Sequence, residues 1–70
     1  MRVNEILSRC RTDQNVLICY DDYHIYGFVY DIVNNREYKE NRVGDMLVTR
    51  ISAYSDSKGE LFIKAVKVWD

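Results

Sequence analysis

The chain has 70 residues, of which 47% are hydrophobic and 30% charged, and its formal net charge at pH 7 is −1. A chain of this length builds one thin core, so we expect a single domain over residues 1–70. The balanced charge argues against a strongly basic nucleic-acid-binding chain, although a local basic face remains open. No apolar run approaches the roughly 18 residues that a membrane span needs.

The chain offers few residues for a metal or a disulfide. Cys10 and Cys19 do not form a CxxC pair, and His24 is the single histidine. Zinc sites need four ligands from such residues, so no metal or other cofactor is predicted. The first residues lack the apolar run of a signal peptide. We therefore expect a cytoplasmic, reduced protein whose thiols are small buried side chains, with a disulfide as the alternative.

The first predicted element is a short helix. Val3, Ile6, Leu7 and Cys10 follow the i, i+3, i+4, i+7 spacing of one helical stripe. Asn4 is the expected N-cap. A helix this short is marginal in water, so it must gain its stability by packing that stripe against a sheet.

Two strands and a tight turn are predicted next. Residues 16–20 are apolar throughout, Asp21 and Asp22 form the turn, and residues 23–33 read as the second strand. Apolar side chains on both faces of the second strand indicate a central strand, or a strand with one face covered by a helix or a partner chain. Gly27 in its middle indicates a bulge or a bend.

A short polar helix over residues 36–42 should connect the two halves as a surface segment. Asn34 and Glu37 have the spacing of a capping box. Gly44 is the expected left-handed residue after the helix. Tyr38 and Val43 are its few apolar contacts.

Two further strands are predicted, over residues 45–54 and 60–69, with a turn at 56–59 that ends on Gly59. In the third strand the better core face is the set Leu47, Thr49, Ile51 and Ala53. In the fourth strand the alternation slips near residues 65–66, which indicates a β-bulge there.

The predicted fold is α+β: a small antiparallel four-stranded sheet of two hairpins, with an N-terminal helix and a short connecting helix. Consecutive strands joined by short links usually pair antiparallel. A strongly bent form of the same sheet would be a small open barrel, and the sequence does not separate the two.

The clearest functional signal is an acidic, tyrosine-rich segment. Residues 12–35 contain four Asp, four Tyr and no Lys or Arg. Tyrosine gives rigid contact area, and carboxylates attract a basic partner such as a nucleic-acid-handling protein. The alternative is that tyrosine favours strands and aspartate favours turns. The predicted partner-binding residues are Tyr20, Asp21, Asp22, Tyr23, Tyr26, Tyr30 and Asp31.

Other functions remain as alternatives. No catalytic nucleophile–base set is evident around the single histidine, so we do not predict an enzyme. A nucleic-acid-binding regulator would use basic residues of the second half: Arg36, Lys39 and Arg42, or Arg50, Lys64 and Lys67. A homodimer would use an unpaired sheet edge with Phe62 and Trp69 as anchors, unless Lys58, Lys64 and Lys67 guard that edge.

Three segments of the first half, residues 3–7, 16–21 and 27–32, resemble short accessory proteins of phages and other mobile elements of Gram-positive bacteria. The resemblance implies a small cytosolic protein without catalysis of its own. Some proteins of this kind, including anti-CRISPR and other anti-defence inhibitors, bind and block a host protein. The resemblance carries over no functional residue.

Overall fold

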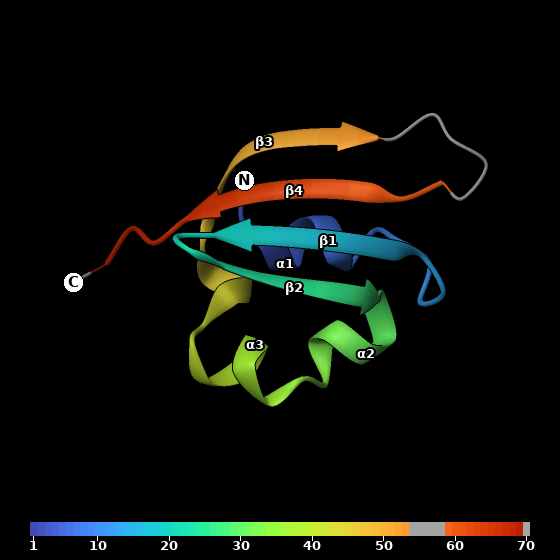
Figure 1. Cartoon of the computed structure of the whole chain (residues 1–70), viewed down its shortest axis with the longest axis horizontal. Helices are drawn as coiled ribbons and strands as arrows, with labels where there is room; N and C mark the ends of the chain where they lie inside the picture. Colours follow the sequence, from blue (N-terminus) through green and yellow to red (C-terminus); the bar gives the residue numbers. More distant parts are fainter. Residues whose placement is uncertain (54–58, 70) are drawn as a thin grey trace.

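The computed structural model describes residues 1–53 and 59–69 (Figure 1). The helices are α1 (Val3–Leu7), α2 (Val29–Val33) and α3 (Arg36–Glu40), followed by the 3-10 turn η1 (Val43–Asp45). The strands are β1 (Asn15–Tyr20), β2 (Tyr23–Phe28), β3 (Leu47–Ala53) and β4 (Leu61–Val66). The predicted α+β class is confirmed. No helix among the described residues is long and apolar enough to cross a membrane.

The sheet is mixed, so the prediction of a wholly antiparallel sheet is wrong. Its order is β2-β1-β4-β3, and the central strands β1 and β4 run parallel. Both predicted strand pairs exist, because β1 pairs antiparallel with β2 and β4 with β3. The helical connection between β2 and β3 returns the chain to the end where β2 began, so both edge strands run in one direction. The sheet is neither closed nor strongly curled, so the open barrel is also wrong.

The second strand is shorter than predicted and lies at an edge. β2 ends at Phe28, and Val29 begins α2. Helical spacing lets Val29 and Ile32 point to the same side, where both are buried, whereas a strand would have put them on opposite faces. Gly27, at φ 155°, lies just before this change of direction, which agrees with the predicted bend.

The helix ends differ from the prediction by one to three residues, and α1 ends at Leu7, before the last residue of the predicted stripe, Cys10. Asn4 is not the cap of α1: Arg2 holds that position, and its backbone N–H donates to Glu5 at 2.9 Å. The cap of α3 is Asn35, whose side chain accepts from the N–H of Glu37 at 2.7 Å. The left-handed residue after α3 is Arg42.

Gly44 has a packing role in place of the predicted cap. It lies in η1, where an added Cβ would come within 2.6 Å of the Tyr38 hydroxyl. Tyr38 and Val43 are both buried, so the region after α2 packs against the core rather than serving only as a surface connector.

A β-bulge lies in β3, between Val48 and Arg50, and not in β4 as predicted. β4 alternates regularly, with Ile63 and Ala65 buried and Lys64 exposed. Before the bulge the inward residues of β3 include Val48, which is in register with Ala65. After it Ile51 shares the inner face, in register with Ile63. The predicted set therefore shares the inner face only after the bulge, and Ile51 is 48% exposed there rather than part of the core. Gly59 is left-handed as expected, and residues 56–58 of the predicted turn lie outside the described residues.

The helices cover one face of the sheet, and the core lies between them and that face. Figure 1 shows the strands in front, α1 behind them, and α2 and α3 beside β2. The fully buried side chains come from the helices, from η1 and from the inward positions of the strands: Val3, Val16, Ile18, Ile32, Val43 and Ile63. The opposite face of the sheet is the open face.

Candidate functional site

The acidic turn forms as predicted. Tyr20 and Tyr23 are partners in the register of β1 and β2, so Asp21 and Asp22 make a two-residue hairpin turn. Asp21 adopts a left-handed conformation, at φ 50°, which aspartate tolerates better than most residues. Both carboxylates are exposed, and no ion pair among the described residues involves either of them.

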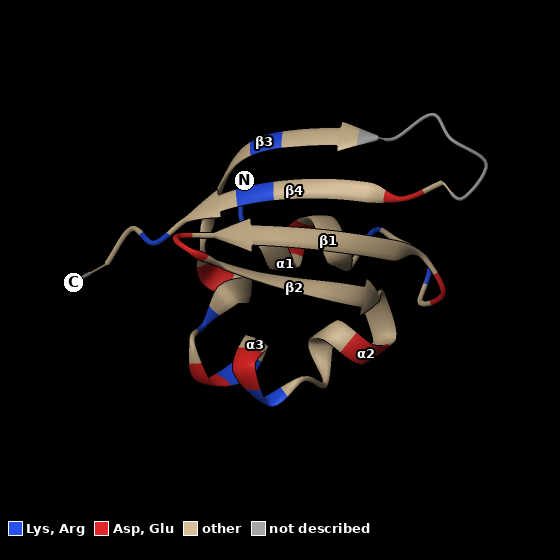
Figure 2. Ribbon diagram, viewed as in Figure 1, with Lys and Arg blue, Asp and Glu red and all other residues tan. Residues whose placement is uncertain are grey.

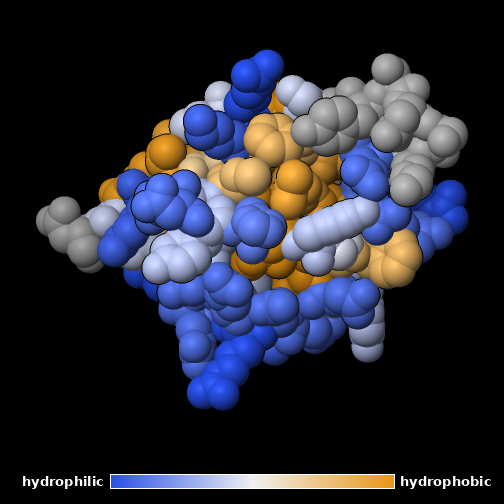
Figure 3. Space-filling model, in the orientation of Figure 1, coloured by the Kyte–Doolittle hydropathy of each residue, from blue (hydrophilic) through white to orange (hydrophobic). Residues whose placement is uncertain are grey.

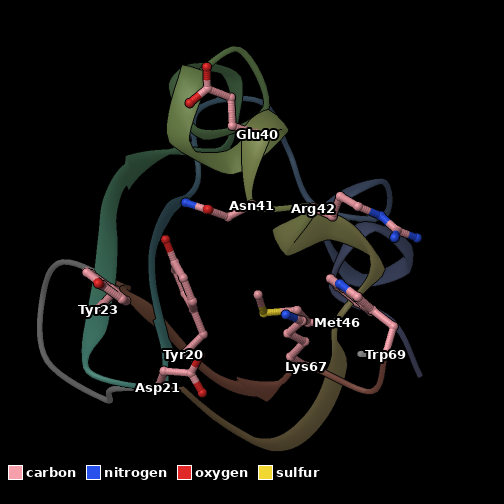
Figure 4. A pocket seen from close by; sticks show the side chains of 9 residues that line it. All are labelled: Tyr20, Asp21, Tyr23, Glu40, Asn41, Arg42, Met46, Lys67 and Trp69. Carbon is pink, nitrogen blue, oxygen red and sulfur yellow. The ribbon is translucent and has the colours of Figure 1, made fainter.

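A hollow of about 370 Å³ opens beside this turn, at the end of the sheet where β1 and β4 finish. The turn, the C-terminal end of α3 and the segment after β4 surround it (Figure 4). Figure 4 shows the ring of Tyr20 pointing into the hollow toward Asn41, with Met46 on the other side, whereas Glu40 points away. The lining residues are Tyr20, Asp21, Tyr23, Glu40, Asn41, Arg42, Met46, Lys67 and Trp69.

Tyr20 is a fixed wall of the hollow. Its side chain is buried, and its hydroxyl donates to the Glu37 carboxylate at 2.8 Å. Desolvation by burial, together with the hydrogen bond and the negative charge of Glu37, raises the pKa of Tyr20 to about 12. The phenol therefore stays protonated at neutral pH and holds the end of β1 against α3. The exposed ring of Tyr23 lies 5.8 Å from the Tyr20 ring at an interplanar angle of 31°.

Arg42 and Trp69 form the opposite wall. The Arg42 guanidinium lies 4.4 Å from the centroid of the Trp69 ring, close enough for a cation–π contact. Arg42 also forms an ion pair with Asp45, at 3.3 Å. The segment after β4 is thereby attached to the turn that follows α3. A second cation, the Lys67 ammonium, lies 6.0 Å from the same ring.

The structure brings only part of the predicted binding set together. Tyr20, Asp21, Asp22 and Tyr23 meet at the turn, although burial removes most of the Tyr20 ring from solvent. Tyr26 is on the open face, opposite to the side on which Tyr20 packs. The remaining two, Tyr30 and Asp31, are exposed on α2, at the far end of β2, about 17 Å away for a strand of this length. One continuous acidic tyrosine surface along the hairpin is therefore not formed.

Sequence reasoning does not find several of the lining residues. Asn41, Arg42 and Met46 approach the turn only through the path of the chain after α3. The sequence contains no sign of the contact between Arg42 and Trp69, which are 27 positions apart. The sequence pattern suggests Trp69 only as an anchor for a dimer, and Arg42 and Lys67 as cations of a nucleic-acid-binding surface.

The two cysteines lie outside this hollow. Both are free, and both are half-buried rather than buried as predicted; burial raises the pKa of the Cys10 thiol. No group of three or more His, Cys, Asp or Glu residues in the described part of the chain could hold a metal ion.

Comparisons with protein-family models, with curated proteins and with solved structures find no match for this chain.

Proposed function

We propose that this chain is a non-catalytic protein-binding module, and that the hollow beside the Asp21–Asp22 turn receives a basic segment of its partner. The observation that carries the proposal is the pair of exposed carboxylates Asp21 and Asp22, which form no ion pair among the described residues. Asp21 and the exposed Tyr23 ring line a hollow of about 370 Å³. A lysine or arginine of the partner would meet the carboxylates, and an apolar neighbour would pack against the exposed Tyr23 ring.

The charges at the turn side of the hollow support a basic partner there, whereas Lys67, on the opposite wall and in no ion pair among the described residues, would attract an acidic group. Glu40 already pairs with Arg36 at 2.7 Å, and Arg42 pairs with Asp45. Among the described residues around the turn, Asp21 and Asp22 are therefore the carboxylates that can pair with a cation of the partner. The described lining includes no histidine or cysteine, so it offers recognition of charge and apolar surface.

The sequence resemblance supplies the class of partner that the proposal names. A host defence protein that handles nucleic acid carries a basic surface, which complements the turn carboxylates. Occupying that surface would block the host protein, so an inhibitory role is part of the proposal.

Selection from a displayed random-peptide library tests the binding mode even though the partner is unidentified. We expect the chain to enrich peptides with Lys or Arg beside a large apolar residue. The double charge reversal Asp21→Lys/Asp22→Lys should weaken the binding of the selected peptides at least tenfold, and Tyr23→Ala should weaken it several-fold.

The matched control is Asp13→Lys/Asp31→Lys, which changes the net charge equally at the opposite end of the hairpin. Equal weakening by the control would show a general charge effect and remove the hollow from consideration. Failure to enrich any peptide that depends on Asp21, Asp22 or Tyr23 would also contradict the proposal.

A further inference from the structure

The open face of the sheet has an orderly arrangement of side chains that the hollow does not use. The register places His24, Cys19, Lys64 and Arg50 in one row across the four strands. Neighbouring strands are about 4.8 Å apart, so this row spans roughly 14 Å. A second row, two residues along each strand, contains Tyr26, Leu17 and Phe62. A cationic row thus lies beside an apolar, aromatic row.

The aromatic row is partly exposed to solvent, because Tyr26 is exposed whereas Leu17 and Phe62 are half-buried. Tyr26 is 51% exposed, and its hydroxyl donates to the Glu60 carboxylate at 2.8 Å. Glu60 precedes β4, two strands away from β2, so the Tyr26 side chain must extend across β1. Phe28, on the same strand and face, is 46% exposed. Figure 3 shows apolar atoms gathered at the centre of this side of the molecule.

The charge on the open face has one sign. Lys64 and Arg50 are both exposed and in register with each other, and Figure 2 shows the two blue segments on β4 and β3. No ion pair among the described residues involves either cation. The described strand positions on this face contain no Asp or Glu, and Glu60 lies at the rim with its carboxylate bonded to Tyr26.

We propose that the open face binds a short stretch of single-stranded nucleic acid, with bases stacked on Tyr26 and Phe62 and phosphates along Lys64 and Arg50. Single strands expose both a flat base and a charged backbone, which match the two rows. A second copy of the chain fits less well, because face-to-face packing would bury the cations without described carboxylates on the face to pair with them. The inference concerns a different surface from the proposed protein-binding hollow and does not depend on it.

Fluorescence anisotropy with labelled ten-nucleotide single-stranded RNA and DNA, and with a DNA duplex, tests the inference. We expect measurable binding of a single strand at low salt and weaker binding of the duplex. Two phosphate contacts on a single strand predict a slope of about −1.4 in log K against log salt, or roughly tenfold weaker binding for a fivefold rise in salt.

Variants assign the binding to this face. Arg50→Gln/Lys64→Gln should weaken binding at least fivefold and flatten the salt dependence, and Tyr26→Leu should weaken it roughly fivefold or more through lost stacking. The matched control is Arg36→Gln/Lys39→Gln, which removes two exposed cations from α3. Circular dichroism confirms that each variant is folded before its binding is compared.

Four results would overturn the inference. They are no binding of either single strand at low salt, equal or tighter binding of the duplex, equal weakening by the α3 control, or a dimer in sedimentation velocity that Leu17→Glu dissociates. The last result would identify the open face as an interface between two copies. Loss of peptide binding in the Asp21→Lys/Asp22→Lys variant bears only on the hollow, so the two proposals can fail separately.

Discussion

Both faces of the sheet carry apolar side chains, yet the fold treats them in opposite ways. Ile18 and Ile63, on the face toward the helices, are fully buried, whereas Tyr26 and Phe28 on the other face are about half exposed. The difference arises because the apolar sides of α1, α2 and α3 all pack on the same side of the sheet. Alternation within a strand therefore shows that two faces exist, but the helices decide which of them becomes the core.

Alanine substitutions at adjacent positions of β1 test this comparison with the largest expected effect. Ile18→Ala, on the covered face, should lower the free energy of unfolding by about 3 kcal/mol, through lost burial and the cavity left behind. Leu17→Ala, on the open face, should lower it by about 1 kcal/mol, because Leu17 is only half-buried. Urea denaturation measures both. Equal losses would mean that the open face is packed as tightly as the core, and would also weaken the nucleic-acid proposal.

The Tyr20 hydroxyl gives the covered face a pH dependence. Its pKa is raised to about 12, so the folded state favours the protonated phenol. The resulting stabilisation is fully present below the unfolded-state pKa of about 10, and it is lost as the pH rises through the folded-state value. The wild-type chain should therefore lose about 2 kcal/mol between pH 9 and pH 12 relative to Tyr20→Phe, which cannot ionise.

Urea denaturation of the wild-type chain and of Tyr20→Phe across this pH range measures the difference. Tyr30→Phe is the control, because its ring is exposed on α2 and should leave the wild-type profile unchanged. Parallel profiles for the wild-type chain and Tyr20→Phe would contradict the assigned role of burial and of the Glu37 contact.

Local patterns in the sequence predict local structure well, and long-range structure poorly. The β1–β2 hairpin and its two-aspartate turn follow from an apolar run ended by turn-forming residues. The parallel pairing of β1 with β4 depends on the helical connection after β2. The sequence pattern predicts a longer strand there, because Val29 and Ile32 suit both a strand and a helix. Because the prediction lacks α2, the predicted connection between the second and third strands is too short to bring β4 beside β1 in a parallel pair.

The candidate site shows the same limit. Asp21, Asp22 and Tyr23 are neighbours in sequence and stay together in the fold. Composition alone groups Tyr26 and Asp31 with them. Strand alternation turns Tyr26 to the other face, and the helix α2 takes Asp31 to the far end of the hairpin. Composition counts residues along a segment, whereas a binding surface needs them on one side of one element.

The smallest predicted effect concerns the cations of the open face. Lys64 and Arg50 are in register on neighbouring strands, and like charges directly opposite each other destabilise a sheet. Lys64→Gln should therefore raise the free energy of unfolding by about 0.3 kcal/mol at low salt, and by less at high salt, where exposed charges are screened. Lys39→Gln, in the last turn of α3, should change it in the opposite direction, because a cation there favours the helix dipole.

Matched urea titrations at low and high salt resolve the sign of these two changes. A loss of more than about 0.5 kcal/mol in Lys64→Gln would show that the lysine stabilises the sheet, since exposed positions without a structural role stay within that range. If Lys64→Gln gains stability but loses single-strand binding, the lysine serves binding and not folding. The repulsion between Lys64 and Arg50 would then lower the stability of the free protein, and bound phosphates would offset that repulsion. This is expected of a surface that is kept for binding at a cost in stability.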